Sequence, residues 1–132
     1  MIDHNYAALA TAVASAFVIS TAYYIVLGRQ YAEARGLSPE AAEARPPAWK
    51  ILVELVRSLT VAAVVAGLAG LLEVPDLAGA TGLALALWMA FPVVLLVGAV
   101  IWDEARPKVA AIHAGHWLVK LVVVASIVGL WR

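Results

Sequence analysis

The chain has 132 residues, of which 64% are hydrophobic and 14% charged, against roughly 45–50% and about 25% in typical soluble domains. A soluble protein of this size has too little interior to hide so much apolar surface, so the surplus is expected to face lipid. The formal net charge is zero and no basic run with interleaved aromatic residues occurs, which argues against a nucleic-acid partner. The absence of cysteine excludes disulfides, thiol catalysis, iron–sulfur clusters and thiolate zinc sites.

Four segments are long and apolar enough to cross a bilayer, whose hydrocarbon core needs about 20 mostly apolar residues in a helix. They are Tyr6–Leu27, Ile51–Leu72, Ala80–Ile101 and Val109–Trp131. The last three are joined by short links, and Asp76 in the first of these links is expected to cap the helix that follows. Short links make neighbouring spans antiparallel. The sequence therefore predicts an all-α membrane protein, a single domain of four transmembrane helices in an up-down-up-down bundle.

The long connection between the first two spans, residues 28–50, carries a helix-start pattern. In Ser38-Pro39-Glu40, a capping hydroxyl precedes a proline at the first helical position and an acid in the first turn. Pro46-Pro47 then stops the helix. We expect a short interfacial helix here, from about Pro39 to Ala44.

The basic residues predict the orientation of the bundle, because cytoplasmic loops carry an excess of Lys and Arg. Six basic residues lie in the first and third loops, whereas only Arg132 lies on the opposite side. Both termini are therefore expected outside, with loops 28–50 and 102–108 in the cytoplasm. The six are Arg29, Arg35, Arg45, Lys50, Arg106 and Lys108.

Small residues recur every four positions, a spacing that lets transmembrane helices approach closely. Two unbroken stripes are Ala8, Ala12, Ala16 and Ser20 in the first span, and Ala78, Gly82, Ala86 and Ala90 in the third. The second span offers Ala62, Ala66 and Gly70, beside Ala63 and Gly67. The alternative is that alanine is simply abundant. Pro92 removes a backbone donor near the middle of the third span and predicts a kink there.

Ionisable residues inside the second and fourth spans are the most specific signal. Such residues are costly in a membrane, face the bundle interior or a water-filled cavity, and by default mark function. Glu54 and Arg57 are three residues apart and share one helix face, as do His113, His116 and Lys120 at i, i+3 and i+7. At about 1.5 Å per residue, Lys120 lies deepest, near the midplane. Tyr23 and Tyr24 are expected near the shallower level of Glu54, and Thr60 near the level of Lys120, so these three residues join the predicted pathway.

The simplest arrangement places these two polar faces against each other, with Glu54 neutralising Arg57, His113 or Lys120. The resulting polar funnel is cationic, which favours an anionic ligand, a Lys120 that gains and loses a proton, or an acid from another subunit. Under the alternative, the charges snorkel to the headgroups and only anchor the helices. His113, His116 and Glu54 are also weak candidates for a metal site.

Three stretches resemble a known family. The opening Asn5-Tyr6-Ala7-Ala8-Leu9, Tyr23-Tyr24 with Gly28-Arg29-Gln30-Tyr31, and the closing run from His113 to Val119 with Ile127 to Trp131 are similar to the DUF1761 family. The resemblance implies a multi-pass protein of the bacterial inner membrane, of unknown function. It carries no established catalytic residues and does not extend to Glu54, Arg57 or Lys120.

Three classes of function compete. The first is a transporter or channel component for protons or a small anion, expected to be a homo-oligomer because four spans enclose little room. The second is a structural or accessory subunit, whose buried charges pair at a helix or subunit interface. An enzyme using His113 or His116 is the weakest, because no nucleophile-plus-base motif accompanies them. No cofactor is expected.

Overall fold

The computed structural model describes residues 5–38, 40 and 46–131, and every regular element in them is helical. Four stretches are long and apolar enough to cross a membrane, the third being α5, η1 and α6 taken together. The predicted all-α membrane fold is therefore confirmed. The elements are α1 (Tyr6–Val26), α2 (Gly28–Arg35), α4 (Ala48–Leu71), α5 (Leu77–Trp88), the π-helical turn η1 (Met89–Val93), α6 (Val94–Trp102) and α7 (Pro107–Leu130). Of the interfacial helix predicted over 39–44, all but Glu40 lies outside the described residues.

Local signals in the sequence set several helix ends. The side chain of Asn5 accepts a hydrogen bond from the Ala8 amide at the start of α1. Asp76 accepts one from the Gly79 amide at 2.8 Å, which confirms it as the cap of α5. Pro107 stands at the start of α7, where its missing N–H costs nothing.

Helix α2 is an element that the sequence pattern did not predict. It has only eight residues, and a helix so short is marginal on its own. It ends at Gly36, whose φ of 73° favours glycine. Tertiary contacts hold it: Ala32 and Ala34 are buried, and Arg106 Nη1 donates to the Ala34 carbonyl at 2.8 Å.

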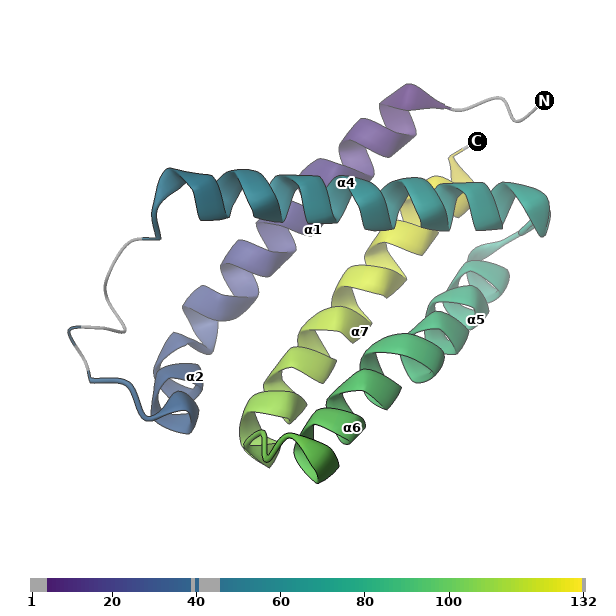
Figure 1. Cartoon of the computed structure of the whole chain (residues 1–132). Helices are drawn as coiled ribbons and strands as arrows, with labels where there is room; N and C mark the ends of the chain where they lie inside the picture. The colour runs from purple at the N-terminus through teal and green to yellow at the C-terminus, as the bar shows by residue number, and fades with distance from the viewer. Residues whose placement is uncertain (1–4, 39, 41–45, 132) are drawn as a thin grey trace.

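Helix α7 is the centre of the arrangement. It packs between α1 on one side and α5–α6 on the other, while α4 lies obliquely across α1 and α7 (Figure 1). Both ends of the chain lie at the same end of the bundle, where Asn5 Nδ2 donates to the Trp131 carbonyl at 3.3 Å. Successive long helices run in opposite directions, as expected for four antiparallel spans.

One of the two predicted stripes of small residues packs inside the bundle and the other does not. All four stripe residues of α1 are buried, and in α4 the buried positions are Ser58, Ala62, Val65 and Ala69. The stripe predicted for the third span is wrong, because its members are exposed and α5 instead buries Ala80 and Ala84. Ala80 packs against α7 beside Gly129, where a Cβ built on the glycine would lie 3.5 Å from the Ala80 Cβ. The exposed stripe is Ala78, Gly82, Ala86 and Ala90.

The proline in the third span changes the helix type. Pro92 lies inside η1, a π-helical turn between α5 and α6. A π turn provides wider spacing around a residue that cannot donate a backbone hydrogen bond. Pro92, the residue predicted to kink the third span, therefore lies in a π turn that interrupts its α-helix.

Candidate functional site

A cavity of 380 Å³ lies between α1, α2, α4 and the first half of α7. Both polar and aromatic side chains line it. The polar ones are Ser20, Thr21, Tyr24, Tyr31, Lys50, Glu54, Arg57, His113 and His116. Phe17 and Trp117 add apolar walls. Its volume falls within the range of about 300–1,000 Å³ that is usual for small-molecule sites.

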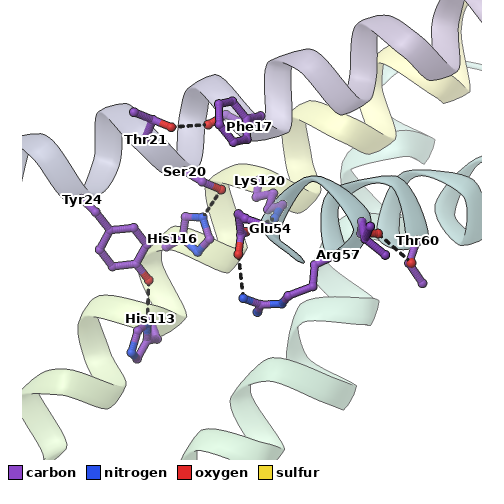
Figure 2. Close-up of polar contacts among 11 residues, drawn as sticks. Phe17, Ser20, Thr21, Tyr24, Glu54, Arg57, Thr60, His113, His116 and Lys120 are labelled. Carbon is purple, nitrogen blue, oxygen red and sulfur yellow. Dashed lines mark hydrogen bonds and ion pairs between the residues drawn. The ribbon is translucent and has the colours of Figure 1, made fainter. Parts of the chain in front are cut away.

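Glu54 joins the charged groups of the two polar spans. Its Oε2 accepts from Arg57 Nη1 at 2.7 Å, and its Oε1 lies 3.4 Å from Lys120 Nζ (Figure 2). The Lys120 side chain is fully buried, whereas the Arg57 side chain is 54% exposed. The ammonium also lies 4.9 Å from the ring centroid of Trp117, a cation–π contact. The polar faces of the second and fourth spans therefore meet, as predicted.

His116 links α7 to α1 through a serine. Its Nε2 lies 2.8 Å from Ser20 Oγ, and the residue is almost fully buried. Its other ring nitrogen, Nδ1, is buried with no hydrogen-bond partner among the described residues. An unpaired buried polar atom is costly, so Nδ1 is a place where a hydrogen bond from a water or a ligand would be stabilising.

His113 lies between two tyrosine hydroxyls. The Tyr24 hydroxyl contacts Nδ1 (Figure 2), and the Tyr31 hydroxyl lies 3.4 Å from Nε2. Tyr24 comes from α1 and Tyr31 from α2, so this imidazole connects three helices at the cavity wall.

Two of the residues expected in the pathway do not line this cavity. Tyr23 donates to the Ile112 carbonyl at 2.7 Å and is not part of the cavity lining. Thr60 donates to the Val56 carbonyl of its own helix at 2.8 Å. It lines a different, apolar groove. The structure thus brings Glu54, Arg57 and Lys120 together with both histidines and Tyr24. Tyr23 lies behind the cavity wall, with its ring centroid 5.5 Å from that of His116.

No set of metal ligands is assembled from the described residues. Among the described residues, no three His, Asp or Glu side chains converge in a way that would hold a metal ion. His113 contacts the hydroxyls of Tyr24 and Tyr31, His116 contacts Ser20, and the Glu54 carboxylate contacts Arg57 and Lys120.

Several lining residues were missed. The sequence spacing could have indicated Trp117, because it follows His113 by four residues and precedes Lys120 by three, on the same helix face. Lys50 was counted only for its charge in the first loop. Tyr31 belongs to the unpredicted helix α2, so no periodicity pointed to it.

Comparison with known proteins gives one match. No curated protein matches the chain, and neither does any solved structure. A family model described as "Protein of unknown function (DUF1761)" matches residues 7–129, nearly the whole chain and all four spans. The chain belongs to the DUF1761 family, as its opening and closing motifs suggested.

Proposed function

We propose that this membrane protein binds a small anion in the polar cavity and acts as a component of a transport system. One observation carries the proposal: among the described residues, the charged side chains that line the cavity are Lys50 and Arg57 against the one carboxylate of Glu54. Lys120, buried behind Glu54, adds a further basic group.

The donors of Arg57 are available for a ligand. A guanidinium has five N–H donors, and one hydrogen bond, to Glu54, is found for Arg57 among the described residues. Its side chain remains half exposed at the cavity wall. Excess positive charge away from bulk water is costly, and an anion bound at Arg57 would offset it.

Proton transfer is the second candidate, and the paired imidazoles and hydroxyls favour it. Tyr24 with His113 and Ser20 with His116 line one cavity, and His116 Nδ1 is buried without a partner among the described residues. These groups accept and donate protons. The structural alternative, in which charges only pair between helices, draws its support from the Glu54–Lys120 contact.

The orientation and the assembly are proposals of the same kind. We place both termini outside and loops 28–50 and 102–108 in the cytoplasm of a bacterial inner membrane, on the basis of the six basic residues in those loops. The cavity would then open toward the cytoplasm. A homo-oligomer is supported by the exposed stripe on α5, since small residues allow close contact between helices.

Flux measurements in liposomes test the proposal. Proteoliposomes containing the wild type are expected to take up acetate, phosphate or chloride faster than empty vesicles, and Arg57→Gln should reduce that uptake at least about tenfold. Arg29→Gln is the matched control, because Arg29 is exposed, pairs with Glu33 and is not part of the cavity lining. Wild-type vesicles that pass protons but no anion would favour the second candidate. Vesicles that pass neither would contradict transport.

A further inference from the structure

A second cavity adjoins the polar one. It is an apolar groove of 610 Å³ between α4 and the α5–η1–α6 helix. Trp117 and Leu121 of α7 also line it. Val64, Phe91 and Leu95 lie along its sides and are exposed. A groove with exposed apolar walls in a membrane protein opens toward lipid.

Two residues line both cavities. Arg57 and Trp117 belong to the polar cavity and also to the apolar groove. Apart from Trp117, the groove residues with a polar side chain are Arg57 and Thr60, which lie three residues apart on α4. The groove therefore has a polar end at Arg57 and Thr60, next to the polar cavity, and its α4 wall is apolar from Val61 to Leu68.

The length of the groove suits a hydrocarbon chain. From Arg57 to Leu68, α4 extends about 16 Å at 1.5 Å per residue. One leaflet of a bilayer has a hydrocarbon thickness of about 15 Å, half of the roughly 30 Å core. The groove is therefore about as long as a lipid acyl chain, and such a chain would lie along α4 with its polar end at Arg57.

From this geometry we infer that the anion is a long-chain fatty acid, its carboxylate at Arg57 and its acyl chain in the groove. The inference rests on the proposed function and names the class of anion. Among the described residues, the polar cavity lining offers Lys50 and Arg57 against the carboxylate of Glu54. With Lys120 behind that carboxylate, basic groups are in excess, which suits the carboxylate of a fatty acid. A planar carboxylate also suits the fork of guanidinium donors.

Two substitutions on α4 distinguish the effect of filling the groove from the effect of adding a large side chain elsewhere on the exposed surface. Val64 lines the groove and is 56% exposed, whereas Val56 lines none of the described cavities and is 55% exposed. Val64→Trp would fill the groove, and Val56→Trp is the matched control. Leu95→Trp fills the groove from the opposite wall and serves if Val64→Trp does not fold.

The experiment measures equilibrium binding of labelled palmitate and labelled butyrate to the full chain in nanodiscs, with binding to empty nanodiscs subtracted. Wild type and Val56→Trp should bind palmitate at least about tenfold more tightly than butyrate, because palmitate buries more apolar surface. Val64→Trp or Leu95→Trp should weaken palmitate binding to the level of butyrate and leave butyrate unchanged. Arg57→Gln should weaken both.

Two results would overturn the inference, and they differ from failure of the proposed function. If the filled-groove variants bind palmitate like the wild type while butyrate still depends on Arg57, the groove does not hold the chain and the anion site remains. If butyrate and palmitate bind alike in the wild type, the ligand is a small anion without an acyl chain. If neither acid depends on Arg57, the anion site itself is wrong.

Discussion

Glu54 Oε1 lies 3.4 Å from Lys120 Nζ, joining α4 to α7 at the polar cavity. The two partners have different surroundings. The Lys120 side chain is fully buried, whereas that of Glu54 is 26% exposed and also holds Arg57 at 2.7 Å. Removing one partner is therefore not equivalent to removing the other.

Glu54→Gln is expected to destabilise the protein far more than Lys120→Met. Loss of the carboxylate leaves a buried ammonium without its charge partner, at a cost of about 3–5 kcal/mol. Loss of the ammonium leaves Glu54 paired with Arg57, so the change should stay within about 1 kcal/mol. The free energy of unfolding in mixed micelles measures both.

Glu33→Gln is the matched control for this comparison. Glu33 pairs with Arg29 at an exposed position, where the loss should stay below about 0.5 kcal/mol. If Glu54→Gln and Lys120→Met proved equally mild, the charges would be reaching water, as in the anchoring interpretation.

Ser20→Ala should cost about 1–3 kcal/mol of unfolding free energy. The substitution removes the partner of His116 Nε2, and the buried imidazole then has no hydrogen bond at either nitrogen within the described part of the chain. Thr11→Ala provides the comparison, because the Thr11 hydroxyl is exposed and donates to the Ala7 carbonyl of its own helix. Equal losses in the two variants, measured by denaturant titration, would mean that the His116 contact contributes nothing specific.

Gly115→Ala should destabilise the α1–α7 interface by about 1–3 kcal/mol. The added Cβ would lie 2.5 Å from Tyr23 Oη, which donates to the Ile112 carbonyl, so the ring must move and that hydrogen bond is lost. A Cβ added at Gly98 would meet no packing neighbour within 4 Å among the described residues. Gly98→Ala should therefore stabilise α6 by up to about 1 kcal/mol. Thermal unfolding in detergent compares them, and a Gly115→Ala variant as stable as Gly98→Ala would contradict the contact.

The orientation can be tested directly, because the sequence contains no cysteine. Leu72→Cys and Asp103→Cys place single thiols at exposed positions on opposite ends of the bundle. In intact spheroplasts, a membrane-impermeant maleimide should label Leu72→Cys, and it should label Asp103→Cys only after lysis. The reverse pattern would place loops 28–50 and 102–108 outside.

The sequence by itself determined the number of spans, their alternation and the residues that carry charge in the membrane. These features depend on composition and on the 3.6-residue period of a helix, both local properties. For Glu54 the sequence allowed two outcomes: its polar face could meet that of the fourth span at a similar depth, or its charge could reach the headgroups.

Only the tertiary structure decided which face of each helix is buried and which neighbours complete the cavity. The stripe that begins at Ala78 and the pair Ala80 and Ala84 have the same four-residue spacing, and it is the packing of α5 against α7 that buries the second. Tyr23 and Tyr24 are adjacent, yet one contacts a backbone carbonyl and the other His113. Tyr31 enters the site because α2 packs against the bundle. Each of these outcomes depends on atoms distant in the sequence, which local periodicity does not encode.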